Sequence, residues 1–209
     1  KFNYLYNLDG KLFSNYTMTT AMMSLRWNPF SDYMQTPTGR IEVEKRFPKF
    51  TLQFTQTLPK IWQNDFEFSK IDFKAEYEKK YFNGQKTSFL FELGYAFGDV
   101  PLTHLYNSSP NNLNKETVIQ RITFAGKNSF ETMYFNEFFS SELAFFQFKH
   151  SFSRIALFKK VKPSIVLVSR MAWGNMNKRE QHVGVDYKTL NNGFFESGIE
   201  LNQIFKGLG

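Results

Sequence analysis

The chain has 209 residues, enough for one large β domain, and a formal net charge of +7. Aromatic residues make up 19% of it and 26 residues are phenylalanine, yet 22% are charged and the mean hydropathy is −0.42. This combination excludes an ordinary soluble domain unless a thick core hides the phenylalanines. The absence of cysteine excludes disulfides and thiolate metal sites, and no apolar run approaches the length of a transmembrane helix, about 18 residues.

The chain reads as a series of strands and turns. In order, we expect strands over residues 1–8, 12–27, 39–45, 50–57, 66–82, 86–97, 142–152, 164–173 and 194–205. The breaks between these strands alternate between short and long, as in an up-and-down barrel with tight turns at one end and long loops at the other. The longest break predicts one elaborate loop over 98–141, with a short strand or helix of its own over 117–125.

Two segments near the middle of the chain alternate between apolar and polar residues with a period of two. In residues 71–78 every second side chain is apolar and those between are acids or lysine, and residues 88–97 repeat the alternation with more aromatics. Successive side chains of a strand point to opposite faces, so each segment predicts a strand with one apolar and one polar face. Strands of roughly 10 residues can cross a bilayer when tilted.

These patterns predict an all-β fold, an antiparallel up-and-down transmembrane β-barrel with about nine strands, of which residues 1–209 form one part. The side chains expected to face lipid are Phe50, Leu52, Phe54, Ile71, Phe73, Phe89, Phe91, Leu93, Phe146, Phe148, Ile165 and Leu167. The side chains expected to face the lumen are Asp72, Lys74, Glu76, Glu78, Glu92 and Arg170. An arginine at mid-depth on the lipid side costs about 2–4 kcal/mol, so we expect Arg170 to pair with an acid of a neighbouring strand or of the inserted loop.

Tyrosine and tryptophan gather at the ends of the predicted strands, as at Trp27, Tyr77, Tyr95 and Trp173. Aromatic residues favour strands in general, but amphipathic rings at a membrane–water boundary form girdles in membrane barrels. Because these residues lie at strand ends rather than in the middles, we interpret them as girdles.

No pattern in the chain indicates an enzyme. The three histidines lie far apart in the sequence and have no partner at metal-ligand spacing, so we expect neither a metal nor a cofactor. The acids of residues 72–78, with Glu92, admit two interpretations: paired carboxylates for acid–base chemistry, or the wet wall of a barrel with cross-strand charge pairs. Lys74 lies between acids and would neutralise them, which favours the wall.

The net positive charge admits attraction to phosphate groups of lipids or of nucleic acids. The basic residues form no dense stripe and the aromatics do not interleave with them, so we expect no nucleic-acid partner. A rival interpretation is a soluble β-barrel or sandwich that binds a lipid or another hydrophobic ligand. Such a protein would keep the alternation but turn the phenylalanines inward.

Several motifs resemble those of a known family. They are Asp65-Phe66-Glu67-Phe68-Ser69-Lys70-Ile71, Phe97-Gly98-Asp99-Val100-Pro101-Leu102, the segment 130–142, His150-Ser151-Phe152, and the segment 157–162. Their order over about residues 45–209 resembles an uncharacterised family of large Bacteroidetes-type outer-membrane barrels that follow a carboxypeptidase-regulatory-like domain. Glu142 stands where the family pattern has aspartate, and Pro163-Ser164 replaces a more basic strand start.

That family is distantly similar to assembly barrels of the BamA and TamA type. The resemblance therefore implies a sixteen-stranded barrel in the outer membrane of a Gram-negative bacterium, with a structural, transport or outer-membrane-assembly role. One long loop folds into the lumen of such barrels, which implies that 98–141 is a plug that includes Asp99, Pro101, His104 and Glu137. The implied partners are outer-membrane lipid and lipopolysaccharide, and other outer-membrane or periplasmic proteins.

Two further expectations concern activity and chain length. The Arg-Gly-aromatic lumen motif of the assembly barrels does not occur in residues 98–141. A porin-like passive channel is the close variant, but a loop of this length argues against a wide pore. The sequence opens without a signal-peptide pattern and stops without a closing strand, so we expect it to be the middle-to-late part of a longer protein.

Overall fold

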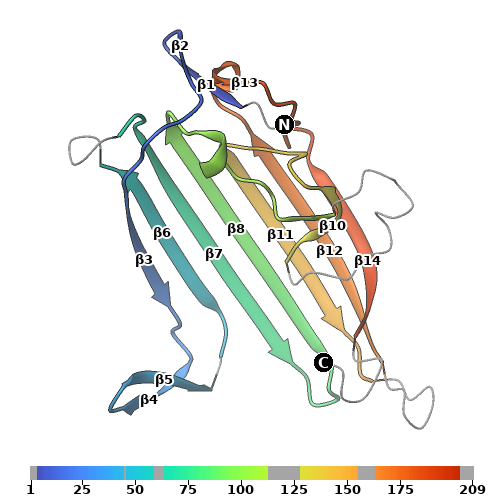
Figure 1. Cartoon of the computed structure of the whole chain (residues 1–209). Coiled ribbons are helices and arrows are strands. Elements are labelled where there is room, and N and C mark those ends of the chain that lie inside the picture. Colours follow the sequence, from blue (N-terminus) through green and yellow to red (C-terminus); the bar gives the residue numbers. More distant parts are fainter. Residues whose placement is uncertain (1–3, 45, 59–63, 113–127, 155–162, 203–209) are drawn as a thin grey trace.

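The computed structural model of the chain describes residues 4–44, 46–58, 64–112, 128–154 and 163–202 (Figure 1). In this part the fold is all-β, without an α-helix. Seven strands form one antiparallel sheet in the order β14-β12-β11-β8-β7-β6-β3. Neighbours in the sheet follow one another along the chain, apart from strands that belong to smaller sheets. The sheet therefore has the up-and-down connectivity that the alternating pattern predicts.

The elements have the following bounds. The main sheet contains β3 (Thr20–Trp27), β6 (Lys49–Thr57), β7 (Phe68–Lys80), β8 (Lys86–Gly98), β11 (Glu142–Ser151), β12 (Ser164–Asn175) and β14 (Phe194–Asn202). The smaller sheets contain β1 (Leu5–Leu8) between β2 (Lys11–Phe13) and β13 (His182–Val183), the hairpin β4 (Asp32–Thr36) and β5 (Gly39–Glu44), and the parallel pair β9 (Pro110–Asn112) and β10 (Phe130–Tyr134). Short 3-10 helices lie at η1 (Leu102–His104) and η3 (Arg179–Gln181).

The predicted number of main-sheet strands, about nine, is too high by two for the described residues. The segment 1–8 contributes β1 to a small sheet, and the segment 39–45 is one arm of the β4–β5 hairpin. The segment 12–27 is divided between β2 and β3. Local alternation is the same whether a strand joins the main sheet or pairs only with its sequence neighbour, so the pattern could not separate these cases.

The main sheet is open in the described residues, with β3 and β14 at its edges. A closed barrel is therefore not observed. The predicted short element at 117–125 and the last residues of the predicted strand 194–205 lie outside the described residues.

The two ends of the main sheet differ. At the turn end, residues 81–85 join β7 to β8, and the β4–β5 hairpin projects from the connection between β3 and β6 (Figure 1). At the loop end lie the small sheet of β1, β2 and β13, the segment 176–193 and the start of the long segment 99–141. The predicted alternation of short and long breaks is confirmed from residue 58 onward, and the hairpin at the turn end departs from it.

The hydrophobic core lies between one face of the main sheet and the segments of the loop end. One cluster joins Phe68 and Ala96 of the sheet to Val100, Leu102 and Phe139 of the long loop. A second cluster lies where β10 crosses the sheet and contains Leu90, Phe130, Met133, Phe138, Phe145, Ala172 and Leu190. The described parts of segment 99–141 therefore form a second layer, and only one face of the sheet is covered by them.

Candidate functional site

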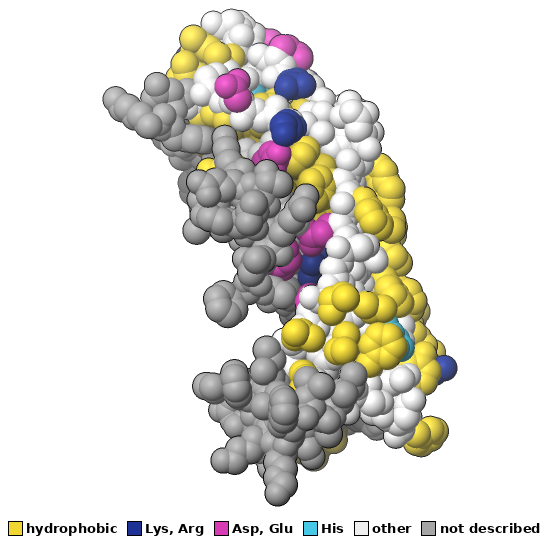
Figure 2. Space-filling view, turned by 90° about the vertical axis from the view of Figure 1, so that its right-hand side faces the viewer, with side chains coloured by type: hydrophobic (Ala, Val, Ile, Leu, Met, Phe, Trp, Pro, Cys, Tyr) yellow, Lys and Arg dark blue, Asp and Glu magenta, His cyan; other side chains and the backbone are white. Residues whose placement is uncertain are grey.

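One face of the main sheet, the apolar face, is not covered by the described residues. The strand register places on it all of the side chains predicted to face lipid. Phe91 is 37% exposed, Leu93 42% and Ile199 68%, although each lies in the middle part of its strand. In Figure 2 hydrophobic side chains line the middle and lower parts of the right-hand side of the molecule. Soluble monomers rarely expose a contiguous apolar surface of this kind.

The apolar surface is long as well as wide. From Phe89 to Phe97, β8 places only aromatic or aliphatic side chains on this face, a length of about 27 Å at ~3.4 Å per residue. A membrane barrel presents an apolar band of about 25 Å. On the neighbouring strands, the charged residues Lys79 and Glu142 lie at the turn end and at the loop end of the face, respectively.

Polar side chains on the apolar face are bonded to one another. Ser169 Oγ lies 2.9 Å from Ser197 Oγ in the middle of the sheet, on adjacent strands. Near the turn end, His150 Nδ1 lies 2.9 Å from Thr87 Oγ1. A hydroxyl group without a partner is costly in an apolar medium, so mutual pairing is the arrangement that such a medium requires.

Aromatic rings mark both ends of the apolar face, as the sequence predicts. Trp27 and Tyr77 lie at the turn end, and Tyr95 and Trp173 at the loop end. The Trp27 ring stacks on Phe50 at a centroid distance of 5.5 Å. These are the positions that interfacial girdles would occupy.

The opposite face, the polar face, carries every side chain predicted to face a lumen. Lys74 Nζ lies 3.2 Å from a carboxylate oxygen of Glu92 and 3.8 Å from one of Glu76, which confirms that Lys74 pairs with the acids around it. Figure 2 places charged side chains inward from the hydrophobic edge. The polar face also contains buried apolar residues such as Leu90 and Phe145, because the long loop covers it.

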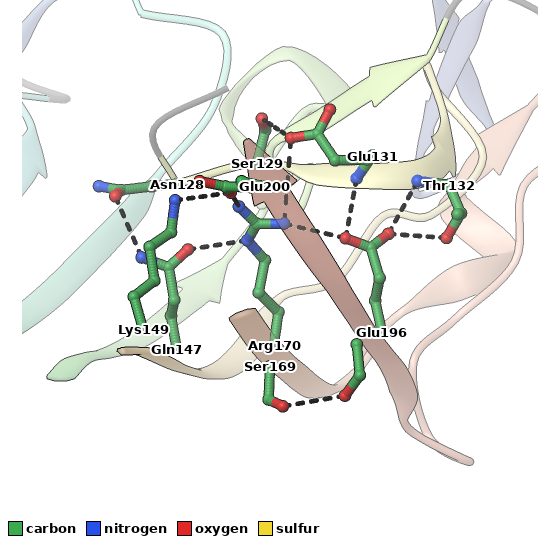
Figure 3. A network of polar contacts seen from close by, with 11 residues as sticks. Asn128, Ser129, Glu131, Thr132, Gln147, Lys149, Ser169, Arg170, Glu196 and Glu200 are labelled. Atoms are coloured by element: carbon green, nitrogen blue, oxygen red, sulfur yellow. Dashed lines mark hydrogen bonds and ion pairs between the residues drawn. The ribbon is translucent and has the colours of Figure 1, made fainter. Parts of the chain in front are cut away.

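Arg170 is the centre of a network on the polar face (Figure 3). Its side chain is only 2% exposed. The guanidinium donates to Gln147 Oε1 at 2.8 Å, to Glu196 Oε1 at 3.0 Å and to Glu200 Oε1 at 3.1 Å. Glu131 of the long loop lies 3.9 Å away. The predicted pairing is confirmed, and Arg170 meets acids of both kinds, from the neighbouring strand β14 and from the inserted loop.

Glu196 connects the loop to the wall. One carboxylate oxygen accepts from the Glu131 backbone N–H at 3.1 Å, and the other accepts from the Thr132 N–H at 2.8 Å and its hydroxyl at 2.7 Å. With the bond from Arg170, four donors satisfy this carboxylate, which holds β10 against β14. Lys149 Nζ, 3.0 Å from Glu200, extends the network toward β11.

A second attachment lies where the long loop begins. Tyr106 packs on Gly94 of β8, and its hydroxyl donates to Asp72 at 2.6 Å. Lys70 lies over the ring at 4.3 Å. Burial, together with the bond to Asp72, raises the pKa of the Tyr106 hydroxyl, so it stays a neutral donor. Gly94 permits this contact because a Cβ there would lie 2.4 Å from the ring.

The four residues predicted to form the plug lie at the loop end, and one of them, His104, contacts the polar face of the sheet. Asp99 and Glu137 form ion pairs of 2.7 and 2.8 Å with lysines of the segment 176–193. Pro101 is buried, and the His104 ring packs 5.2 Å from Phe68. Burial, and then the nearby Lys70 charge, lower the pKa of His104. Asp99 and Glu137 therefore join loops to one another, whereas His104 packs on β7 of the main sheet.

Apart from Asp72 and Arg170, the residues that attach the loop to the sheet were not among the predicted site residues. They are Tyr106, Glu131, Thr132, Gln147, Lys149, Glu196 and Glu200. Glu196 and Glu200 carried a usable signal, since acids four residues apart in a strand share a face. The others act through contacts between distant parts of the chain, which no local pattern records.

A hollow of about 550 Å³ opens on the polar face beside this network, toward the turn end. Its lining includes Glu78, Lys86, Lys149, Ser151 and Glu200. The lining carries both positive and negative side chains, and several of these side chains already form ion pairs with one another. The hollow therefore suits water and small hydrophilic solutes better than a single charged ligand. Within the described ranges, no three histidines or acids are arranged to hold a metal ion.

Comparison with known proteins gives one match. Residues 3–104, just under half of the chain, match the model of a family described as a family of unknown function (DUF5686), C-terminal domain. No curated protein and no solved structure matches the chain. Among the described residues, no helix has the length and apolar character needed to span a membrane. The family match agrees with the resemblance to an uncharacterised family, and the two overlap over residues 45–104.

Proposed function

We propose that this chain forms part of the wall of an outer-membrane β-barrel whose interior is closed by the segment 98–141. One observation carries the proposal: the uncovered face of the sheet exposes phenylalanine and aliphatic side chains, while the opposite face buries Arg170 with its acids. Folding in water favours the opposite arrangement, because burial of apolar surface contributes about 25 cal/mol per Å². Hydrocarbon on one side and a polar interior on the other remove this conflict.

The attachment of the long loop supports a closed interior. Tyr106 fixes the start of the described loop on Gly94 and Asp72, and Glu196 fixes residues 131 and 132 near its other end. A loop held at two places over the polar face reduces the space through which solutes could pass. We therefore propose a structural, transport or outer-membrane-assembly role with a plugged lumen, rather than a wide passive pore.

The soluble, ligand-binding alternative requires the phenylalanine face to line an enclosed interior. In the described residues that face carries exposed side chains, and the enclosed face carries Arg170 and its acids. The geometry therefore supports the membrane role better. The surroundings that we propose are outer-membrane lipid and lipopolysaccharide, with other outer-membrane or periplasmic proteins as further partners.

Membrane extraction tests the membrane role. We expect the full-length protein to sediment with membranes and to require detergent for a monodisperse preparation. Extraction in buffer alone as a monodisperse species would contradict the proposal.

Conductance in planar bilayers tests the plug. We expect deletion of residues 103–128 to raise the conductance of the reconstituted protein, because the deletion removes Tyr106 and with it one of the two attachments of the loop to the polar face. Unchanged conductance would argue against a lumenal seal while leaving the membrane role intact.

A further inference from the structure

The charges of the molecule are distributed unevenly between the two ends of the main sheet. At the loop end acids outnumber bases among the described residues, with Asp9, Asp65 and Glu67 among the acids. At the turn end bases outnumber acids in the described part. Three of the acids there are paired: Asp32 with Arg46 at 2.9 Å, Glu42 with Lys49, and Glu78 with Lys86 at 3.1 Å.

Four further exposed cations lie at the turn end. Three of them form no ion pair in the described residues, and the fourth, Lys80, shares Glu78 with Lys86, at 3.9 Å. The four are Arg40, Lys79, Lys80 and Arg154, which we name the basic collar. They come from three separate parts of the chain: the β4–β5 hairpin, the last two residues of β7 and the segment after β11. The positive charge is thus spread along the turn end. A groove that follows a nucleic-acid backbone would instead require the charge to be concentrated in one stripe.

Aromatic side chains accompany the collar. The Arg40 guanidinium lies 5.7 Å from the Tyr33 ring and Lys79 Nζ lies 5.3 Å from the Tyr81 ring. Phe82, at the tip of the turn, is fully exposed. Cations beside amphipathic rings are typical of the boundary between hydrocarbon and water, where the ring contacts the acyl chains and the charge reaches the headgroups.

The collar is continuous with the apolar face. Lys79 lies on that face in the strand register, two residues beyond Tyr77. Trp27, 60% exposed, is the last residue of β3, and the register leads from it through Phe50 to Ala75, four residues before Lys79. If the apolar face contacts hydrocarbon, the collar lies at the depth of the phosphate groups of one leaflet.

We propose that the basic collar binds the headgroups of anionic phospholipids in the leaflet that surrounds the turn end. The proposal rests on the membrane role proposed above. Basic residues close to an anionic membrane surface each contribute enough attraction to enrich such lipids about fivefold at low ionic strength. The described residues of the loop end have no comparable excess of positive charge, so enrichment is expected at the turn end only.

Tryptophan fluorescence tests this inference, because the chain carries Trp27 at the turn end and Trp173 at the loop end. Two single-tryptophan proteins are needed, W62F/W173F and W27F/W62F, each reconstituted as the whole chain in phosphatidylcholine bilayers. Brominated phosphatidylglycerol or brominated phosphatidylcholine then serves as the quencher at equal mole fraction. We expect Trp27 to report about fivefold stronger association of phosphatidylglycerol, and Trp173 to report no preference.

Charge-neutralising variants provide the control. K79Q/K80Q is expected to reduce the preference at Trp27 to about twofold, whereas K11Q/K188Q, which removes two exposed lysines at the loop end, leaves it unchanged. About 0.5 M salt should also abolish the preference, because it shortens the screening length to less than about 5 Å.

The outcomes separate the two proposals. Quenching of both tryptophans without lipid preference, or a preference that K79Q/K80Q does not reduce, overturns the collar and leaves the membrane role standing. If neither brominated lipid quenches either tryptophan, the apolar face does not contact hydrocarbon and both proposals fail.

Discussion

At the scale of single residues, Arg170 is the clearest case of a charge that is tolerated only because of its surroundings. Three acids and one amide satisfy a guanidinium that is almost fully buried. Such a network is costly to break, because loss of one member leaves the others charged and unpaired in a medium of low dielectric constant.

Replacement of Arg170 by methionine should therefore destabilise the protein strongly. R170M leaves Glu196 and Glu200 without their main partner, and we expect a loss of about 3–5 kcal/mol in the free energy of unfolding, measured by urea titration in micelles. R26M is the matched control, because Arg26 of β3 also lies on the polar face but is exposed. We expect R26M to change the free energy of unfolding by less than about 0.5 kcal/mol. Equal effects of the two substitutions would show that the network contributes nothing.

His182 is a second residue whose chemistry depends on burial. Its Nδ1 lies 2.9 Å from the Tyr4 hydroxyl, and burial lowers its pKa to about 4, although nearby Glu180 acts in the opposite sense. Because the pKa of His182 is lower in the folded protein than in the unfolded chain, folding favours the neutral ring. Its contribution to stability is complete above the unfolded pKa of about 6.5 and is lost as the pH falls toward 4.

We accordingly expect the small sheet of β1, β2 and β13 to loosen on acidification, by about 3 kcal/mol at most. An NMR titration of the His182 ring in the whole protein measures this directly, with a midpoint near pH 4 expected. A midpoint near 6.5 would mean that the ring is open to water and that acid does not loosen this sheet.

Sequence patterns predict which face a residue occupies, but not which residue it meets. The alternation placed Arg170 on the polar face and indicated that an acid would pair with it. It could not identify Glu196 and Glu131 as the acids, because they lie 26 and 39 residues away in opposite directions along the chain.

At the scale of elements, the long loop behaves as a layer of the fold with two attachments to the sheet. The Gly94–Tyr106 contact is the more local of them. An alanine at position 94 would place its Cβ 2.4 Å from Tyr106 Cζ, so the ring must move and the bond to Asp72 is lost.

G94A should therefore loosen the start of the loop. We expect a cost of about 1–3 kcal/mol and faster limited proteolysis within residues 99–112 of the reconstituted protein. The control is G198A, because Gly198 lies on the polar face of β14 with nothing within 4 Å of the added Cβ. Proteolysis rates that do not differ between G94A and G198A would rule out a tight Tyr106 attachment.

The strands could be predicted because period-two alternation is a local property of the sequence. The segments that became β6, β7, β8, β11, β12 and β14 all carry it. The β4–β5 hairpin was assigned as one loop and one isolated strand, although Gly39, which adopts φ 133°, marks its turn. Pairing partners depend on the rest of the fold, and that information is not present in a local pattern.

At the scale of the whole molecule, the sheet reverses the arrangement of a soluble protein. Its covered face holds Arg170 and the acids around it, and its uncovered face holds most of the phenylalanines of the strands. In the described residues the two hydrophobic clusters lie between the polar face and the segments that cover it, the long loop and the segment 176–193. A surrounding medium that favours apolar contact would make this arrangement stable.

The most direct test of that claim is a spin-label scan along β8, residues 88–97, in the protein reconstituted in lipid bilayers. Each position is changed in turn to cysteine and labelled, and its collision rates with oxygen and with a water-soluble nickel chelate are measured. We predict a period of two, with high oxygen and low nickel accessibility at Phe89, Phe91, Leu93, Tyr95 and Phe97 and no such oxygen exposure at the positions between. High nickel accessibility at Phe91 and Leu93, or a maximum of oxygen accessibility at Glu92, would contradict the account.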